Sequence, residues 1–577
     1  MVEFYVSPTG DDSTAGTADR PFGTVERARR AAREVRGDVT VHLRAGTHVL
    51  TEPFELDEDD SGVVYQAFER EEAVISGGRA VTGRRDPDGV WRAEVGDLVT
   101  RHLVVDGRRV ERAGVDGLPG AVRRTATGYV TDAPLDWHST TGVEFVHRGV
   151  YPWTEARAAV ASTTREGDGT VITMAQPAFG WAQDVYNSEW SGQVSSGLPE
   201  PTRVENDPAF LTPGTFALDR SRPGHHVLHY LPLPDEDDPH VVAPALEVLL
   251  RATGTRDVAF RGLVFADTTW LRPGGERGFL HYHANGYYDG GRIGRVDVAE
   301  GAWLTVPEEH ELIPAGVRLD GTTGVRFEGC RFTRLGATGL GATGGADLVV
   351  RGCDFDAIAA SAIAVTGTRG ALVEDNLVER VGLDHSGSAG ITVQGTEGCA
   401  VEHNHVHDVP HNGIVANPGR GTRIAHNLVT DSMGVLADGG GVYLSGPQGD
   451  SFESGALISG NVIENVRTPY NFGLYADYGA RWVRIEGNAV SRADNTAVLH
   501  VGPPLEHVVF EGNTWDADPV GGDDVPPGVT YRGNTTVTGP DFAAATAEVR
   551  ARAGLLTARG PATPGLRAPG LRAPRGA

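Results

Sequence analysis

Two short segments of the chain combine carboxylate and aromatic side chains in a pattern that could do chemistry. The first is Asp438–Ser445 (DGGGVYLS) and the second is Phe472–Asp477 (FGLYAD). In both, a glycine precedes an apolar residue, a tyrosine and another apolar residue. Two neighbouring carboxylates can act as a general acid and as a base or nucleophile, and tyrosines beside them can contact a sugar ring. Their similarity indicates successive turns of a repeat.

Length, charge and cysteine content limit the classes of protein to consider. A chain of 577 residues is too long for one ordinary core, unless the fold is a repeat that grows along one axis. The net charge of -26 argues against nucleic acid or an anionic membrane as partner. The cysteines, Cys330, Cys353 and Cys399, are too few for a disulfide framework. With no basic and apolar leader at the start, we expect a cytoplasmic protein, unless a signal has been trimmed.

A repeat occupies the C-terminal half of the chain. Short alternating segments such as Val483–Asn488 (VRIEGN) recur, and the commonest interval between their last residues is 23 residues. Alternating strands at this period are typical of a parallel β-helix. We therefore predict an all-β, right-handed parallel β-helix, whose asparagines sit in tight left-handed corners and form a ladder. The ladder positions are Cys330, Cys353, Asn376, Asn404, Asn427, Asn461, Asn488, Asn513 and Asn534.

The presence or absence of the repeat along the sequence also predicts domains. From Val25 to Val35, apolar residues recur at helical spacing after a possible N-cap, Thr24, and such a helix can cover the open end of the repeat. The predicted domains are 1–100 (N-terminal β-helix turns and capping helix), 101–245 (inserted β-rich domain), 246–540 (main β-helix with the catalytic groove) and 541–577 (C-terminal helix and disordered tail).

Insertions in the repeat gather around the two opening segments. Each turn has a second strand that starts with a small residue, and in most of the regular turns this residue precedes the next ladder position by 14. Gly441 precedes Asn461 by 20, and the extra residues fall in the polar loop 446–455. The chain also lengthens after Asn376, Asn427 and Asn461. Loops on one face of a repeat array commonly build a binding site.

Strand alternation assigns the side chains of these second strands to two faces. Residues such as Val442 and Leu474 are expected to point inward, and the next residues to form an outward column that includes Tyr443 and Tyr475. Two residues further on, a second outward column contains Asn417, Ser445 and Asp477. We predict a tyrosine platform beside Asp477. The following turn is expected to add His500 to the tyrosine column.

Further candidates lie around this groove. Asp438 is expected at its rim, where Gly439 and the next two glycines would let the chain turn sharply and admit a ligand closely. His411 and Asn412 open the preceding turn and could orient sugar hydroxyls or a catalytic carboxylate, with plain loop structure as the alternative. Trp270 is a candidate stacking wall.

Two further sets of histidines and acids are weaker candidates. His405 and His407 alternate on a strand, so a zinc site is conceivable, although two surface histidines are the simpler interpretation. Asp384 and His385 lie in the loop before another of the small residues. The sequence predicts no metal and no cofactor.

A series of motifs resembles a known family. Taken in order over nearly the whole chain, to about residue 555, they resemble glycoside hydrolase family 141, whose members include α-L-fucosidases and xylanases. A more distant resemblance is to the family 120 β-xylosidases, which share the fold. The resemblance implies a catalytic aspartate pair, at the positions of Asp438 and Asp477. The motifs are Phe4–Asp11 with Pro21–Thr24, Val41–Thr47, Ile75–Gly78, Trp153–Arg157, Tyr230–Pro234, Phe260–Phe265 with Thr268–Trp270, and Asp438–Tyr443.

The register and the resemblance together predict an enzyme. We expect a glycoside hydrolase that uses the aspartate pair to cleave a glycosidic bond, most readily a fucoside or xyloside, in an oligo- or polysaccharide of plant or microbial origin. Its expected partner is that carbohydrate, with no nucleic acid and no membrane, and the oligomeric state stays open.

Two other classes compete with this prediction. A polysaccharide lyase or uronate epimerase can also use a β-helix, but pectate-type lyases need a calcium cluster and a basic proton abstractor. The chain has no lysine for that task, although an arginine could serve. A non-catalytic carbohydrate-binding β-helix would keep the tyrosines without needing both aspartates.

Overall fold

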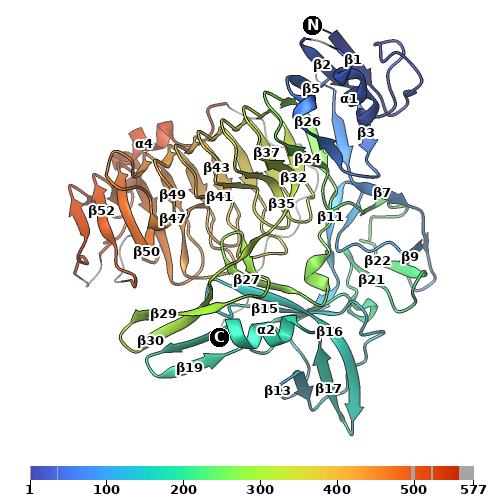
Figure 1. Ribbon diagram of the computed structural model, residues 1–577. Helices are drawn as coiled ribbons and strands as arrows, with labels where there is room; N and C mark the ends of the chain where they lie inside the picture. Colours follow the sequence, from blue (N-terminus) through green and yellow to red (C-terminus); the bar gives the residue numbers. More distant parts are fainter. Residues whose placement is uncertain (1, 36, 70, 496–500, 521–523, 558–577) are drawn as a thin grey trace. The chain divides into compact units, whose positions relative to one another are not determined.

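The chain forms two compact units. Unit 1 consists of Met1–Gly77, Val248–Ala266 and Pro314–Ala577, and unit 2 of Gly78–Glu247 and Asp267–Ile313. The second domain thus starts earlier than the predicted 101–245 and takes in a further stretch after residue 266. The computed structural model (Figure 1) describes residues 2–35, 37–69, 71–495, 501–520 and 524–557.

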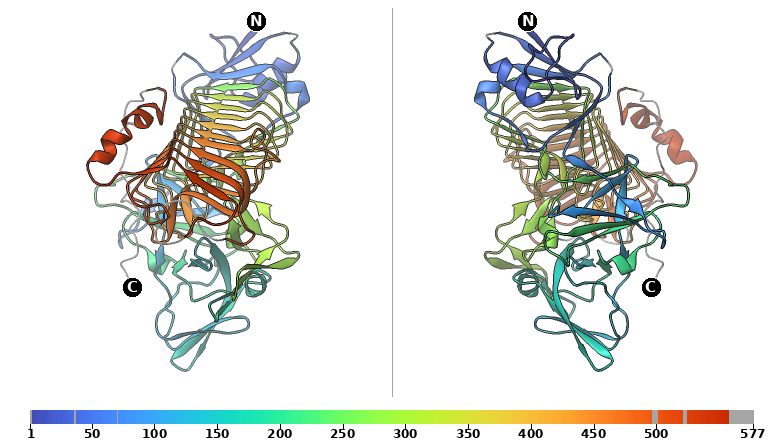
Figure 2. Two further views of the ribbon diagram at one scale, coloured as in Figure 1. Left: turned by 90° about the vertical axis from the view of Figure 1, so that its left-hand side faces the viewer. Right: turned by 90° about the vertical axis from the view of Figure 1, so that its right-hand side faces the viewer.

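Unit 1 is the predicted right-handed parallel β-helix, with three columns of parallel strands (Figures 1 and 2). The first column, which carries the candidate site, consists of β4 (Phe54–Leu56), β24 (Leu250–Thr253), β32 (Ala315–Asp320), β35 (Thr338–Thr343), β38 (Ile363–Thr366), β41 (Ile391–Gln394), β44 (Ile414–Ala416), β47 (Gly439–Pro447) and the first part of β50 (Asn471–Glu486).

The other two columns close each turn of the helix. The second consists of β1 (Val2–Val6), β2 (Val39–Leu43), β5 (Val63–Ala67), β25 (Ala259–Arg261), β33 (Arg326–Glu328), β36 (Val349–Arg351), β39 (Leu372–Glu374), β42 (Ala400–Glu402), β45 (Arg423–Ala425), β48 (Ala456–Ser459), the second part of β50, β52 (Glu506–Glu511) and β54 (Val529–Arg532). The third consists of β3 (Gly46–Val49), β6 (Ala73–Ser76), β26 (Leu263–Ala266), β34 (Arg331–Thr333), β37 (Asp354–Asp356), β40 (Leu377–Glu379), β43 (His405–His407), β46 (Leu428–Thr430), β49 (Val462–Glu464), β51 (Ala489–Ser491), β53 (Thr514–Trp515) and β55 (Thr535–Thr536).

Like side chains stack along the core of unit 1, because each strand pairs in register with its equivalent in the next turn. Phe260 stacks on Phe327 with ring centroids 4.8 Å apart, and Phe332 stacks on Phe355 at 4.5 Å. The asparagine ladder is confirmed. The side-chain nitrogen of Asn427, for example, donates to the side-chain oxygen of Asn461 at 2.9 Å.

The left-handed corner lies one residue earlier than predicted. His426, with φ 55°, takes this conformation in the turn of Asn427, and Gly460 (φ 63°) takes it in the next turn. The asparagine itself is free to point into the core, where its amide bonds the turns on both sides.

We expect Asn427→Ala to lower the free energy of unfolding by about 3 kcal/mol, because buried hydrogen-bonding groups lose their partners. The Asn427 side chain makes four hydrogen bonds, to Asn404, Val401 and Asn461. Urea unfolding would measure the loss. The matched control is Asn534→Ala, at the last rung, where the side chain is half-buried and makes three such bonds, so a smaller loss is expected. Equal losses would contradict a ladder that depends on burial.

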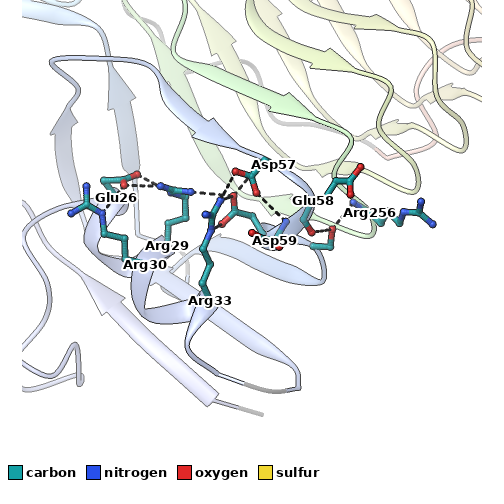
Figure 3. A network of polar contacts seen from close by, with 10 residues as sticks. Glu26, Arg29, Arg30, Arg33, Asp57, Glu58, Asp59 and Arg256 are labelled. Atoms are coloured by element: carbon teal, nitrogen blue, oxygen red, sulfur yellow. Dashed lines mark hydrogen bonds and ion pairs between the residues drawn. The ribbon is translucent and has the colours of Figure 1, made fainter.

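The first end of the β-helix is covered by helix α1 (Val25–Arg33), as predicted, with Thr24 accepting a hydrogen bond from the Arg27 backbone at 3.1 Å. Ion pairs join this helix to the next turn (Figure 3). Arg29 and Arg33 both contact the buried carboxylate of Asp60, at 3.3 and 2.6 Å. Ion pairs and the apolar face of helix α1 therefore both hold it on the first turns of the β-helix.

The C-terminal segment forms two short helices, α3 (Asp541–Ala545) and α4 (Ala547–Arg552), in place of the single predicted helix. Phe542 packs against Val462 of the third column. Beyond the helices, the Leu556 backbone donates to the Asp375 carboxylate at 2.7 Å. The predicted disordered tail from residue 558 lies outside the described residues.

Unit 2 is a β-rich domain whose strands pair mostly antiparallel. It holds one α-helix in its described residues, α2 (Ala178–Val185). No helix in the described part of the chain is long and apolar enough to cross a membrane. The strands are β7 (Gly78–Val81), β8 (Arg84–Arg85), β9 (Trp91–Gly96), β10 (Leu103–Val105), β11 (Arg108–Arg112), β12 (Gly114–Val115), β13 (Val122–Arg124), β14 (Gly128–Thr131), β15 (Glu144–Arg148), β16 (Glu155–Glu166), β17 (Gly169–Met174), β18 (Asn187–Trp190), β19 (Gln193–Ser196), β20 (Arg203–Glu205), β21 (Thr215–Asp219), β22 (His226–Leu231), β23 (Val241–Pro244), β27 (Phe279–His283), β28 (Gly286–Tyr288), β29 (Ile293–Ala299), β30 (Ala302–Pro307) and β31 (Glu311–Leu312).

Candidate active site

Two tyrosine–aspartate hydrogen bonds cross between neighbouring turns of unit 1. The Tyr475 hydroxyl, on β50, donates to Asp438 at 3.0 Å, at the start of the preceding turn. The Tyr443 hydroxyl, on β47, donates to Asp477 at 2.8 Å, in the following turn. Each turn therefore supplies one tyrosine and one aspartate, and each tyrosine bonds the aspartate of the other turn.

The pairing of β47 with β50 creates this arrangement. Tyr443 lies opposite Tyr475, and Ser445 lies opposite Asp477, in the register expected from the sequence. The two phenol rings meet edge to face, with centroids 5.2 Å apart. Because alternate residues share a face, both tyrosines and Asp477 project from the same side of the sheet.

The tyrosines do not form the exposed platform predicted for them. Tyr443 is 6% exposed and Tyr475 is 3% exposed. The face of Tyr475 is covered by Phe472, which stacks on it at 4.0 Å. Their hydroxyl groups are therefore placed to hold the two carboxylates, and their rings pack inside the protein.

The three glycines after Asp438 serve packing, and the predicted sharp turn is wrong. Gly439 is buried at the start of strand β47, where a Cβ would lie 2.7 Å from both Asn412 and His411. A Cβ on Gly440 would lie 2.6 Å from the carbonyl oxygen of Phe472. The close approach that these glycines allow is between their own backbone and neighbouring turns of the protein. Gly439 as a contact for substrate stays a prediction.

His411 and Asn412 hold the backbone on both sides of Asp438. The His411 ring, through Nε2, donates to the Ala437 carbonyl at 3.1 Å, and its Nδ1 accepts from the Asn412 amide at 3.0 Å. The Asn412 oxygen accepts from the Gly440 backbone at 2.7 Å. These buried residues therefore act on the carboxylate through the chain that carries it, so the predicted contact with sugar hydroxyls stays a prediction.

A row of polar side chains leads along the second outward column to Asp477. Asn417 donates to Gln394 at 3.3 Å, and Ser445 donates to Asn417 at 3.0 Å. Asn417 is 8% exposed. Asp477 occupies the next position of the same column, so the predicted column is confirmed.

The two carboxyl groups are electrostatically coupled. Burial, together with the charge of Asp477, raises the pKa of Asp438 from 3.8 to about 7. Burial also raises the pKa of Asp477, but hydrogen bonds from Tyr443 and the Tyr478 backbone oppose this rise. More donors thus stabilise the charged form of Asp477 than that of Asp438. In weakly acidic solution the arrangement therefore favours the proton on Asp438 over Asp477.

We expect Tyr475→Phe to move the alkaline limb of any pH–rate profile upward by about one pH unit, because a hydrogen bond that stabilises the ionised Asp438 is lost. The profile of kcat/KM against pH is the measurement. Tyr443→Phe is the matched control, since its hydroxyl bonds Asp477 instead. A downward shift with Tyr475→Phe would contradict the assigned hydrogen bond.

Sequence reasoning missed two exposed tyrosines at the ends of this segment. Tyr470 is 47% exposed, and its carbonyl accepts from the Asp438 backbone at 2.8 Å. Tyr478 is 38% exposed and directly follows Asp477. Partial burial together with the charges of the two aspartates raises the pKa of Tyr470 to about 12.

The remaining predicted residues belong to segments other than β47 and β50. His500 lies outside the described residues. Trp270 belongs to unit 2, is 4% exposed and packs edge-on against Phe279 with centroids 5.7 Å apart, so a stacking role for it stays a prediction. His405 and His407 share a face, and His407 pairs with Glu379 at 3.2 Å. Within the described ranges, no group of three or more His, Cys, Asp or Glu side chains could hold a metal ion.

Comparisons with known proteins bear on the fold. A family model for a right-handed β-helix region matches residues 311–450 and 386–515. A solved glycoside hydrolase is similar over 96% of this chain and 99% of its own, with a TM-score of 0.74 and 21% identity. The structure of XylC in complex with xylose is similar over 89% of this chain and 75% of its own, with a TM-score of 0.50 and 13% identity. No curated protein matches the sequence.

These findings define the class of protein to which the chain is similar. The right-handed parallel β-helix is shown, and the fold is shared with a glycoside hydrolase. At these identities the likeness is one of fold, so membership of family 141 stays a prediction.

Proposed function

We propose that the protein is a glycoside hydrolase whose catalytic groups are Asp438 and Asp477. The observation that carries this proposal is the crossed pair of tyrosine–aspartate hydrogen bonds, which holds two coupled carboxyl groups on neighbouring turns. Glycoside hydrolysis requires two such groups with different protonation states. The difference here comes from the environment of each carboxyl group.

Asp438 acts as the general acid in this proposal. With a pKa of about 7 it is protonated in weakly acidic solution, and it can donate its proton to the glycosidic oxygen as the bond to the anomeric carbon breaks. Asp477 acts as the carboxylate on the opposite face of the sugar ring. There it either takes a proton from the attacking water or bonds to the anomeric carbon first. The configuration of the product sugar separates these two routes.

A fucoside or a xyloside is the proposed substrate class. The order of motifs along the chain, which resembles family 141, supports it. Further support comes from the fold likeness to XylC, a protein solved with xylose. The proposal extends to carbohydrate of plant or microbial origin.

A panel of aryl glycosides tests the proposal. Aryl α-L-fucoside, β-xyloside and α-L-arabinoside would be offered to the wild type, Asp438→Asn and Asp477→Asn, with release of the aryl alcohol as the signal. We expect turnover of at least one glycoside by the wild type and a large loss in both variants. Equal turnover by all three proteins would refute the mechanism.

The same experiment separates the competing classes. A lyase would release unsaturated uronates from an acidic polysaccharide, with new ultraviolet absorbance and no hydrolysis. A non-catalytic binding protein would retain oligosaccharide in a pull-down, release no product, and bind equally well after Asp438→Asn.

A further inference from the structure

One corner of the β-helix takes the same backbone conformation in turn after turn. At the end of most strands of the first column, the chain passes through a left-handed glycine. Glycine suits the corner because it lacks the Cβ that makes this conformation unfavourable for other residues. The corner glycines and their φ angles are Gly254 (65°), Gly321 (63°), Gly344 (65°), Gly367 (63°), Gly395 (61°) and Gly446 (63°).

Tyr478 occupies this corner in the turn of Asp477. The register makes the equivalence clear, because Ser445 pairs with Asp477, and Gly446 and Tyr478 are the residues that follow. Tyr478 keeps a positive φ of 38° and is exposed. Among the described turns the corner also departs from glycine at Pro418 and, in the turn of β4, at Glu58. A bulky aromatic residue in this conformation is an outlier of the kind that gathers at functional sites.

Tyr470 stands at the opposite end of the same strand segment, in an equally uncommon conformation. It is the register equivalent of Asp438, and the two residues have φ angles of 58° and 56°. Its ring contacts Phe472 edge to face at 5.7 Å, and Phe472 in turn stacks on Tyr475. Two exposed tyrosines thus stand at the two ends of the segment that holds Asp477 and pairs with the turn of Asp438.

The charge around this segment limits what the tyrosines can bind. Asp438 is the register equivalent of Tyr470, and Asp477 directly precedes Tyr478. The Asp494 carboxylate accepts a hydrogen bond from the Tyr470 backbone at 3.0 Å. The carboxylates of Asp477 and Asp494 repel an anionic sugar such as a uronate, whereas Asp438 carries a proton in weakly acidic solution. Exposed tyrosine rings, by contrast, offer an apolar face and a hydroxyl to a neutral pyranose.

We propose that Tyr470 and Tyr478 form two sugar-stacking subsites at the two ends of the aspartate pair, so that the ligand is a neutral oligosaccharide with at least two sugar rings. This inference rests on the proposed function and deepens it. Tyr478 is kept at a corner that is glycine in most turns because its ring contacts the ligand.

Substitutions at the corner separate binding from folding. Tyr478→Gly restores the residue that the equivalent corners use, so we expect a melting temperature that is unchanged or slightly raised. We expect the same variant to bind oligosaccharide about three- to tenfold more weakly, because an aromatic contact is lost. Tyr470→Asn should weaken binding by a similar factor, and asparagine tolerates the left-handed conformation of this position. Tyr478→Phe and Tyr470→Phe keep the rings and should largely restore affinity.

Calorimetric titration in the Asp438→Asn background measures the affinities without hydrolysis. The probes are xylotetraose and fucosyllactose as neutral ligands and tetragalacturonate as the anionic one. With Asp438 intact, the loss on a neutral oligosaccharide should fall on KM more than on kcat, as expected for a binding contact. Tighter binding of tetragalacturonate than of both neutral probes would overturn the inference.

Each remaining outcome also decides between explanations. Full affinity in Tyr478→Gly and Tyr470→Asn, with hydrolysis still dependent on both aspartates, would remove the subsites and leave the proposed function standing. A marked fall in the melting temperature of Tyr478→Gly would show a structural role and overturn the inference for that residue. If the wild type neither hydrolyses the aryl glycosides nor binds the neutral probes, the proposed function fails and the subsites fail with it.

Discussion

Replacing Asp438 by asparagine is expected to lower kcat on the best glycoside substrate by about 10²- to 10⁴-fold, the usual contribution of a general acid. The physical reason is that asparagine cannot donate a proton to the leaving oxygen, whereas its shape and its tolerance of a positive φ match those of aspartate. The backbone at residue 438 has φ 56° and bonds to Tyr470, and both features survive the change.

A control with the same geometry distinguishes catalysis from local disruption. Asp431 also has a positive φ of 55°, is half-buried, and pairs with Arg467 at 3.0 Å. Asp431→Asn should leave kcat within about twofold, since the lost ion pair is a partly exposed one. Rates would be measured with an aryl leaving group of high pKa, where protonation matters most. Unchanged kcat in Asp438→Asn on that substrate would rule out its role as the acid.

The free energy of unfolding is expected to fall by up to about 4 kcal/mol as the pH rises from about 4 to about 7.5, through Asp438 alone. Its pKa is about 7 in the folded protein against 3.8 in the unfolded chain. Between these values the folded state holds a proton that the unfolded state has released, so increasing pH favours unfolding. Above the folded pKa the effect levels off. The raised pKa of Asp477 acts in the same direction.

Asp438→Asn removes this titration and provides the comparison. The variant should be more stable than the wild type above about pH 7, and its stability should depend less on pH in that window. Urea unfolding at several pH values, with the difference between the two proteins as the signal, cancels the contributions of other groups. A variant less stable than the wild type at pH 8 would contradict the raised pKa.

The repeat could be predicted from the sequence because it is enforced at every turn. Equivalent residues must stack in a parallel β-helix, so Asn427 and Asn461 recur at fixed places, and so do the outward residues Tyr443 and Tyr475. The register of the site strands followed from the same rule. The left-handed corner was misplaced by one residue, because His426 gives no signal of its conformation.

The parts that could not be predicted depend on the direction of side chains and on segments that do not follow the repeat. Alternation places Tyr443 on an outward face, but whether its ring lies open or folds against Asp477 depends on contacts that no periodicity encodes. The second stretch of unit 2, Asp267–Ile313, interrupts the β-helix after β26 with strands that belong to another sheet system. Tyr478 could have been found, since the sequence alone shows glycine after Thr343, Thr366, Gln394 and Ser445.

The corner glycines have a consequence for how such a protein acquires new specificities. At Gly321, Gly344, Gly367 and Gly395, an added Cβ would meet no atom closer than 3.7 Å. A larger residue there disturbs no packing and costs about 1–2 kcal/mol of backbone strain. Each of these four turns thus has room for a side chain at the corner, spaced about 4.8 Å from the next. Single mutations along this row can add ligand contacts one at a time, so that substrate range evolves, or is engineered, without rebuilding the scaffold.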